Sequence, residues 1–312
     1  MAITYREQAY KTFGRVLAIE NGDMELYVTL DIGPRIIHYA LAGGENFMFE
    51  DVNAEIVNQD ASFDTFFYPG AFWRTYGGHR IWLTPEAWPD SYIPDNDPVS
   101  YTVEGNVFTF TPPAQKSIHV AERLILTVAE NGTEVTVRAE ATNIGTQPRT
   151  FGMWQLTVMC PNGLAIVPQT VRDTHLLHNR RMSLWAYTEM NDERVHWGKT
   201  LFSLRQDPSS DHPFKVGITN ERGFAAYLCH GAMFVKRLPF YADVTYPDDG
   251  CNFEIYTNPQ ILELESLGKL AAVTPGDTIS SEEVWSLTPD VAAPDASDEN
   301  AMNEIIAKYI EK

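Results

Sequence analysis

Short runs of alternating apolar and polar residues, separated by turn signals, recur along most of this 312-residue chain. In the clearest case, Val120 to Val128 leads into Asn131-Gly132, and the run from Glu134 to Ala141 returns with nearly strict alternation. A side-chain period of two belongs to the β-strand, and Asn-Gly between two such runs is the strongest short hairpin signal. The pattern therefore predicts an antiparallel hairpin with one wet face.

The same signals extend this prediction along the chain. A second hairpin is expected over residues 14–30, with its turn at Asn21-Gly22, and a strand buried on both faces over Thr150–Met159. The segment from Arg172 to Met182 is ambiguous and could form one helix. Many short strands with almost no helix predict an all-β sandwich or barrel.

One domain is expected over residues 1–288, because the rhythm of strands runs unbroken to that point. The polar segment from Pro289 to Asp298 is interpreted as a linker. Ile305, Ile306 and Ile310 then stand at helical spacing, which predicts a short C-terminal helix packed on the sandwich. Linker and helix together occupy residues 289–312.

The net charge of -19 argues against a nucleic acid or an anionic membrane surface as the partner, and a neutral small molecule fits better. No stretch approaches eighteen apolar residues, and the N-terminus lacks a signal-peptide pattern. Three scattered cysteines do not make a disulfide framework, so a cytoplasmic protein with reduced thiols is expected. The oligomeric state is left open by the sequence.

The most concentrated set of functional side chains lies between Tyr76 and Glu86. This stretch brings His79, Arg80 and Trp82 close to the carboxylate of Glu86, with many aromatic residues on both sides. Its paired glycines allow the backbone to turn and another group to approach closely. A buried aromatic loop with a structural histidine is one interpretation; the wall of a ligand pocket is favoured, since such pockets combine apolar surface with a few convergent polar groups.

Two carboxylates, Glu263 and Glu265, stand two residues apart in an apolar run, so a strand would place both on one face. On a solvated face they would be ordinary surface groups. In a cleft, their like charges and the low dielectric would raise the pKa of one of them. That arrangement suits a general acid or base.

Three further residues are candidates for ligand contacts, each beside a simpler alternative. Arg35 stands among apolar neighbours and either pairs with a carboxylate or points into a cleft. Lys236 is either surface charge or the cation that holds a ligand hydroxyl. Asn252 ends a polar turn, for which a plain Asx-type turn is favoured.

Neither a metal nor a cofactor is expected. His175 and His178 are three residues apart, but no cysteine or carboxylate pattern joins them. Cys229 beside His230 is a weak indication of thiol–imidazole chemistry, and burial of the cysteine as a small hydrophobe is favoured. No glycine-rich phosphate loop follows a predicted strand.

Three segments resemble the galactose-mutarotase-like (aldose 1-epimerase-like) superfamily, most closely one branch of it. The first is Leu30–Ile36, the second is Gly77–Trp82 with Pro85-Glu86, and the third is Leu262–Gly268 followed by Pro275-Gly276 and Glu283-Val284-Trp285. The likeness covers roughly residues 14–288. It implies a large antiparallel β-supersandwich with a sugar-sized cleft on its concave face.

The resemblance also implies a reaction. In the family, a glutamate takes the proton of the anomeric hydroxyl and a histidine protonates the ring oxygen, so the ring opens, rotates and closes with inverted C1. By motif position, Glu265 would be the base, with Glu263 as a less favoured substitute.

The residue that should donate the proton departs from the family pattern, because Trp154 stands where the family's histidine is expected. One hypothesis is a mutarotase- or epimerase-type isomerase in which His79 supplies the acid and Arg80 polarises a hydroxyl. A second is a non-catalytic carbohydrate-binding protein with Trp82 or Trp154 as a stacking platform. A third, less favoured, is a lyase or hydrolase that uses the two carboxylates. The first hypothesis requires that His79 and Glu265 face each other across one cleft.

Overall fold

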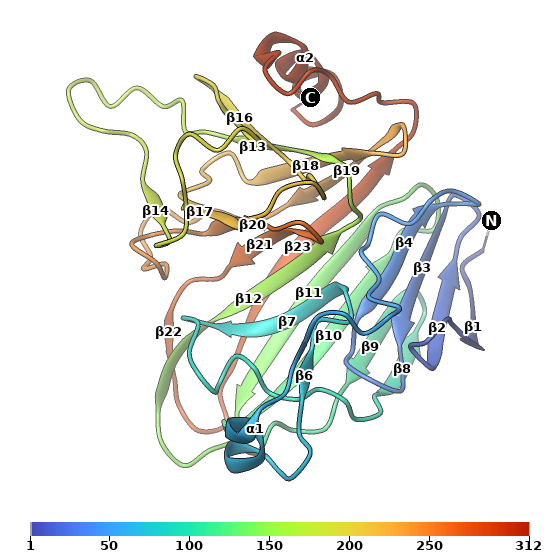
Figure 1. Ribbon diagram of the computed structural model, residues 1–312. Helices are drawn as coiled ribbons and strands as arrows, with labels where there is room; N and C mark the ends of the chain where they lie inside the picture. The colour runs from blue at the N-terminus through green and yellow to red at the C-terminus, as the bar shows by residue number, and fades with distance from the viewer. Residues whose placement is uncertain (1, 312) are drawn as a thin grey trace.

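Two large antiparallel sheets form the molecule in the computed structural model, which describes residues 2–311 (Figure 1). The first sheet runs, in spatial order, β1 (Thr4–Ala9), β2 (Arg15–Glu20), β3 (Met24–Thr29), β4 (Ile36–Leu41), β7 (Gly78–Thr84), β12 (Arg149–Met159), β21 (Leu262–Leu267), β20 (Phe253–Thr257), β17 (Phe214–Ile218) and β14 (Met182–Leu184); β22 (Ala271–Val273) also pairs with β12. The second sheet runs β15 (Val195–Trp197), β16 (Leu201–Arg205), β13 (Leu164–Pro168), β18 (Phe224–Cys229), β19 (Ala232–Arg237), β23 (Thr278–Thr288), β11 (Val135–Asn143), β10 (Val120–Val128), β9 (Val107–Thr111) and β8 (Ser100–Glu104).

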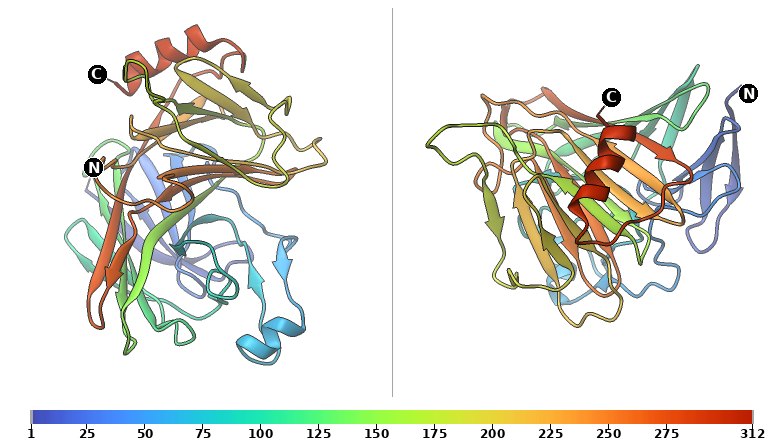
Figure 2. Two further views of the ribbon diagram at one scale, coloured as in Figure 1. Left: turned by 90° about the vertical axis from the view of Figure 1, so that its left-hand side faces the viewer. Right: turned by 90° about the horizontal axis from the view of Figure 1, so that it is seen from above.

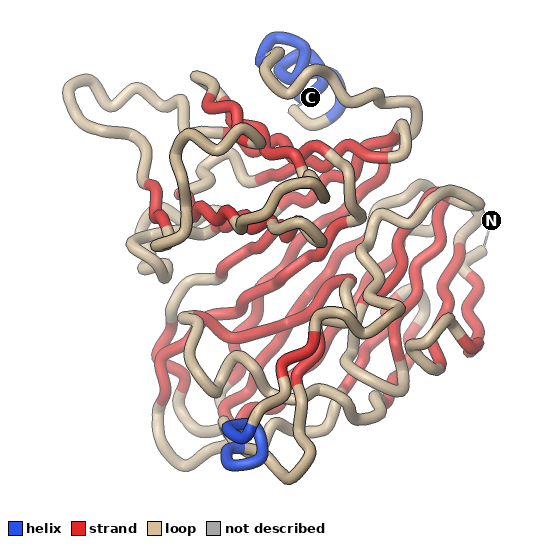
Figure 3. Tube along the Cα trace, in the orientation of Figure 1, coloured by secondary structure: helices blue, strands red, loops and turns tan. Residues whose placement is uncertain are grey.

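Outside these sheets, the strands β5 (Val57–Asn58) and β6 (Trp73–Arg74) pair with each other, and the helices are α1 (Ala61–Phe66) and α2 (Glu299–Tyr309). Strands dominate the trace (Figure 3). The prediction of an all-β sandwich with a short C-terminal helix is therefore confirmed. No helix within residues 2–311 combines the length and apolarity needed to cross a membrane.

Both hairpins expected from Asn-Gly turns are present. In the pair β10 and β11, Val128 lies opposite Val135 across the Asn131-Gly132 turn, and β2 and β3 pair around Asn21-Gly22. Most inward positions of these strands are apolar, as at Leu124, which lies in one continuous core between the two sheets; Glu122 of β10 and Asn143 of β11 are buried polar exceptions. Alternation in the sequence was thus sufficient to set both the pairing and the buried face.

Two glycines place the strand β7 at the centre of the first sheet. Gly77 and Gly78 have φ angles of 100° and 65°, a conformation that other residues rarely adopt. A Cβ atom on Gly77 would lie 2.1 Å from the carbonyl oxygen of Phe49, and one on Gly78 would lie 2.3 Å from that of Ile36. The close approach of neighbouring backbone therefore requires glycine at both positions.

Helix α2 covers the outer face of the second sheet at one end of the molecule (Figure 2). Met302, Ile306 and Ile310 form its buried stripe and pack on residues of β13, β18 and β19. Glu299 fixes the start of the helix, because its carboxylate accepts hydrogen bonds from the backbone N–H of Lys199 at 3.0 Å and of Thr200 at 2.6 Å.

The structure decides two local segments that the sequence left open. The stretch from Gly78 to Thr84 is not a loop but the strand β7, whose two faces are both largely buried, so its sequence lacks simple alternation. The segment from Arg172 to Met182 contains no helix. There the carboxylate of Asp173 accepts from the N–H of His175 at 2.7 Å, a local turn that competes with helical hydrogen bonding.

Candidate functional site

A pocket of about 280 Å³ opens on the face of the first sheet that points away from the second sheet. We call it the carboxylate pocket; five adjacent strands form its floor, and it is lined by Ile56, Asn58, Trp73, Thr75, Arg80, Trp82, Glu86, Tyr92, Trp154, Leu156, Tyr187, Lys215, Tyr256, Asn258, Ile261, Glu263 and Glu265. A neighbouring cavity of about 320 Å³ shares Glu86, Tyr92 and Trp154 with it. Together the two reach the size of a small-molecule site, roughly 300–1,000 Å³.

The two carboxylates at the floor come from one strand. Glu263 and Glu265 alternate with apolar residues in β21, so both side chains point into the pocket, with their Cα atoms roughly 7 Å apart. Register places Glu265 opposite Glu254 of β20, and Glu263 opposite Tyr256. Three carboxylates thus gather on one patch of sheet, a costly arrangement unless cations or protons neutralise them.

Lys215 of β17 provides one of these cations. Its ammonium lies 2.7 Å from Oε2 of Glu254 and 3.2 Å from Oε2 of Glu265. The indole N–H of Trp154 also donates to Oε2 of Glu265 at 3.0 Å. One oxygen of Glu265 is therefore held by two donors, which fixes the carboxylate in place.

Arg80 of β7 provides the other cation. Its guanidinium contacts Oε1 of Glu263 at 3.3 Å and lies over the ring of Trp82, 4.3 Å from the ring centroid. Trp82 in turn packs edge-on against Trp154 and Tyr92, with centroids 5.4 and 5.1 Å apart. Charged groups and aromatic walls are thereby fixed relative to each other.

Burial and neighbouring charges shift the pKa values of the ionisable residues in this patch. Burial first, and then the charge of Glu265, raise the pKa of Glu254 to about 9 against the effect of Lys215. Burial also raises the pKa of Glu263 to about 7, although Arg80 lowers it. Burial disfavours the ammonium of Lys215, but Glu265 and Glu254 outweigh burial and raise its pKa. At neutral pH the patch thus holds a charged Lys215 between Glu254 and Glu265, and a Glu263 near the midpoint of its titration.

Several polar atoms in the pocket lack a partner in the described part of the chain. They are Oε1 of Glu265, Nε and Nη1 of Arg80, and the indole nitrogen of Trp73. Buried polar atoms in folded proteins are nearly always hydrogen-bonded, because an unpartnered one costs about 1–3 kcal/mol. One acceptor and several donors therefore point to a ligand that carries hydroxyl groups.

Six of the ten residues expected at a site line the carboxylate pocket. They are Glu265, Glu263, Arg80, Trp82, Glu86 and Trp154. The other four lie elsewhere.

His79 and Lys236 lie between the two sheets, not in the pocket. Alternation along β7 turns His79 to the opposite face from Arg80, where it contacts the hydroxyl of Thr157 at 3.0 Å and the ring of Trp285 edge-on. The ammonium of Lys236 contacts that hydroxyl at 3.0 Å and Glu283 at 2.9 Å. Burial, followed by the charge of Lys236, lowers the pKa of His79 well below its usual value. We call these residues the inter-sheet network: His79, Thr157, Lys236, Glu283 and Trp285.

This position separates His79 from Glu265 by the thickness of the sheet. A proton from His79 would have to pass through strand β7 to reach a ligand that contacts Glu265. The structure therefore does not bring together the acid and base expected from the sequence.

Arg35 and Asn252 also lie outside the pocket. Arg35 is buried and pairs with Asp95 at 2.5 Å. Asn252 has its side-chain oxygen on the backbone N–H of Asn220 at 2.7 Å, so it stabilises a turn. Arg35 therefore has the carboxylate partner that was one of its alternatives, and it also lines a second cavity. Asn252 joins two distant segments of the chain instead of closing an Asx-type turn of its own.

The residues that sequence reasoning missed include two charged residues of the patch and two tyrosines at its rim. Lys215 and Glu254 are charged residues within otherwise apolar strands, the same signal that singled out Glu263 and Glu265. Tyr187 and Tyr256 carry no such signal, because aromatic residues are frequent throughout the chain.

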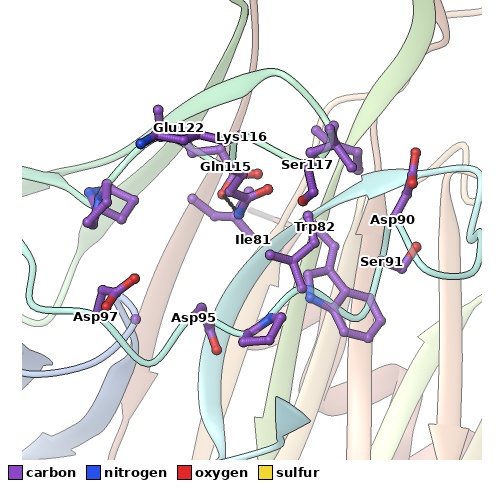
Figure 4. A pocket seen from close by; sticks show the side chains of 18 of the residues that line it. Ile81, Trp82, Asp90, Ser91, Asp95, Asp97, Gln115, Lys116, Ser117 and Glu122 are labelled. Carbon is purple, nitrogen blue, oxygen red and sulfur yellow. Dashed lines mark hydrogen bonds between the residues drawn. The ribbon is translucent and has the colours of Figure 1, made fainter. Parts of the chain in front are cut away.

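A larger cavity of about 640 Å³ lies beside β7, under the segments 90–97 and 112–118 (Figure 4). It contains the Arg35–Asp95 pair and the buried Glu122, which accepts a hydrogen bond from Gln115 at 2.8 Å. Trp82 lines both cavities. We place the candidate site in the carboxylate pocket, because there two carboxylates of one strand, which can serve as a general acid and a general base, face two cations.

Replacing Glu122 by glutamine is expected to remove a loss of stability that the wild-type protein shows as pH rises from 6 to 8. Burial, and then Asp95, raise the pKa of Glu122 to about 8, so the folded state holds its proton more tightly than the unfolded state. This stability is complete below the unfolded pKa and is lost as pH rises through 8, by about 2 kcal/mol between pH 6 and pH 8. Urea unfolding of both proteins at the two pH values measures it. An equal loss in Glu122→Gln would contradict the assignment.

No protein-family model matches the sequence, and no curated protein matches it. Solved structures do match its fold. A provisionally assigned aldose 1-epimerase from Klebsiella pneumoniae has a TM-score of 0.58 at 12% identity, over 98% of this chain and 87% of that chain. A galactose mutarotase-like protein from Lactobacillus casei has a TM-score of 0.56 at 8% identity, over 87% and 99%.

A TPR-domain containing protein from Parabacteroides distasonis matches with a TM-score of 0.57 at 14% identity, over 90% of this chain. The present chain spans about half of that protein, 48% of its length. These likenesses show that the chain has the galactose-mutarotase-like fold, as the three sequence segments predicted. At such low identity they show the fold alone.

Proposed function

We propose that this protein binds a free sugar in the carboxylate pocket and exchanges its anomers by acid–base catalysis. One observation carries the proposal: Oε1 of Glu265 and two nitrogens of Arg80 are buried without partners beside aromatic walls. A sugar offers hydroxyl groups for such atoms and C–H faces for the rings. The names of the structural neighbours, mutarotase-like and aldose 1-epimerase, support the same class of ligand.

The charges in the pocket favour a sugar without phosphate. Arg80 already contacts Glu263, and Lys215 lies between Glu254 and Glu265. Because both cations are paired with carboxylates, neither is free to neutralise a phosphate dianion. The net charge of -19 disfavours a polyanion further.

In the proposed mechanism, Glu265 is the base. Its free Oε1 takes the proton of the anomeric hydroxyl, and the C1–O5 bond breaks as the C1 carbonyl forms. Glu263, protonated in about half of the molecules near pH 7, gives its proton to O5. Rotation about C1–C2 and reversal of both proton transfers close the ring with inverted C1. Glu263 thus takes the role that sequence reasoning gave to His79.

Sugar binding without turnover is the second candidate function. One observation supports this alternative: none of the described residues that line the carboxylate pocket or its neighbour is a histidine. The paired carboxylates would then serve only as hydrogen-bond acceptors, with Trp82 and Trp154 as stacking surfaces.

Anomer exchange on a panel of freshly dissolved α-aldoses distinguishes these functions. Polarimetry or NMR exchange should show a rate that rises in proportion to protein concentration above the buffer rate. Saturable binding without acceleration would favour the second function. Neither acceleration nor binding for any aldose would contradict both.

The pH profile tests the role of Glu263. Because the protonated form is the acid and its pKa is about 7, kcat/KM is expected to fall about tenfold per pH unit above 7. Glu263→Gln should lose this dependence together with most of the activity. A wild-type kcat/KM that stays constant up to pH 9 would exclude Glu263 as the acid.

A further inference from the structure

Two cysteines and a histidine from distant parts of the chain meet at one edge of the sandwich, outside the carboxylate pocket. The sulfur atoms of Cys160 and Cys229 and a ring nitrogen of His230 all lie within 4.8 Å of one another. None of the three lines the carboxylate pocket or its neighbour. We propose that they form a binding site for a thiophilic metal ion, Zn²⁺ or Cu⁺.

The backbone on both sides of the cluster is fixed. Cys160 follows β12 directly; its N–H donates to the carbonyl of Phe47 at 2.8 Å, and its carbonyl accepts from the hydroxyl of Tyr227 at 2.5 Å. Its side chain is buried. The first ligand is therefore held in place before any ion arrives.

The other two ligands come from the tight turn between β18 and β19. Cys229 ends β18, and His230 and Gly231 connect it to β19 with φ angles of 55° and 71°. Positive φ at both central residues is typical of a type I′ hairpin turn. The ring of His230 packs edge-on against Phe47, with centroids 5.8 Å apart. A short turn and an aromatic contact thus orient both side chains.

The donor set selects the ion. Thiolates favour Cu⁺ and Zn²⁺, and imidazole also suits zinc. Zn–S distances of about 2.3 Å and Zn–N distances of about 2.0–2.1 Å place tetrahedral ligand atoms roughly 3.5–4 Å apart. The cluster therefore closes on an ion with shifts of about an ångström. His230 is exposed, so the ion has an entry path and an open fourth position.

The two thiols also differ in exposure. Cys160 is buried and Cys229 is half-buried, so Cys229 is the more accessible of the two.

A bound ion would join the two sheets. Cys160 extends from β12 of the first sheet, and Cys229 belongs to β18 of the second. An ion that binds only the folded chain stabilises it by mass action. The thermal midpoint of the reduced protein is therefore expected to rise with added Zn²⁺.

Competition with a chromophoric chelator tests the site on reduced, chelator-treated protein, with Zn²⁺ and, in a separate arm, Cu⁺. One ion per chain is expected, with affinity lowered at least tenfold in Cys160→Ser, Cys229→Ser and His230→Asn. Cobalt(II) should give a thiolate-to-metal absorption band that Cys229→Ser lacks. Cys251→Ser is the matched control, because that buried thiol contacts Ser183 at 3.5 Å and should leave affinity unchanged.

Two further measurements keep the test decisive if Cys160→Ser fails to fold. His230→Asn keeps both thiols and changes a residue of an exposed turn. In the wild-type chain, Zn²⁺ should slow alkylation of Cys229. Stoichiometric binding that the Cys229→Ser and His230→Asn changes leave intact would overturn the proposal. So would the absence of binding by either ion, or a Cys160–Cys229 disulfide as the only chemistry of the pair.

Discussion

Replacing Glu265 by glutamine is expected to lower the rate of anomer exchange by about 10²–10⁴-fold. The amide keeps the length and shape of the side chain, and its oxygen can still accept from the indole of Trp154, which lies 3.0 Å from the present carboxylate. It cannot accept a proton from the anomeric hydroxyl. The loss should therefore appear in kcat, measured by polarimetry at saturating sugar, with a smaller change in KM.

Two controls separate this chemistry from general damage. Glu282→Gln removes an exposed carboxylate of the second sheet and should leave the rate within twofold of the wild type. A thermal melt of Glu265→Gln shows whether the fold survives, since Lys215 keeps its contact with Glu254 at 2.7 Å. A folded Glu265→Gln protein with undiminished kcat would remove Glu265 from the mechanism.

Replacing Lys236 by methionine is expected to lower the free energy of unfolding by about 3–5 kcal/mol. The fully buried ammonium contacts Glu283 at 2.9 Å and the carbonyl oxygens of Gln155 and Leu264 at 3.1 and 2.9 Å. Methionine fills similar space but leaves a buried carboxylate and two carbonyls without their donor. Urea unfolding followed by fluorescence or circular dichroism measures the change.

The double variant Lys236→Met/Glu283→Gln tests the cause. With both charges removed, part of the lost stability should return, because an amide oxygen can still accept from the indole of Trp285 that now donates to Glu283 at 2.9 Å. Lys269→Met, at an exposed lysine, should change stability by less than about 0.5 kcal/mol. A loss at Lys236 no larger than at Lys269 would show that the inter-sheet network does not stabilise the sandwich.

The pattern of the sequence predicted the sheets well where one face is wet or the turn is explicit. The hairpin of β10 and β11 and that of β2 and β3 follow from alternation and an Asn-Gly turn, which depend only on residues close in the chain. The strand β12 was predicted as buried on both faces, and it is. The strand β7 was missed, because a strand with two buried faces and a histidine–arginine pair shows no period of two.

The candidate site was predicted in part, because two of its residues are related by their spacing within one strand. Glu263 and Glu265 share a face because they are two residues apart, a rule that holds in any strand. Trp82 and Trp154 line the pocket from adjacent strands, in register with each other. Lys215 could not be connected to them, because its strand joins the patch only through the pairing of β17 with β20.

The stretch from Tyr76 to Glu86 shows most clearly what the sequence determines and what only the tertiary structure decides. The sequence by itself determined only that its two glycines can admit neighbouring backbone. The pairing of β7 with β12 makes the stretch a strand, in which the consecutive residues His79 and Arg80 point in opposite directions. Only the tertiary structure decided which of the two faces the ligand pocket. That choice depends on where the second sheet packs: its Lys236, Glu283 and Trp285 enclose His79 and leave Arg80 on the open face.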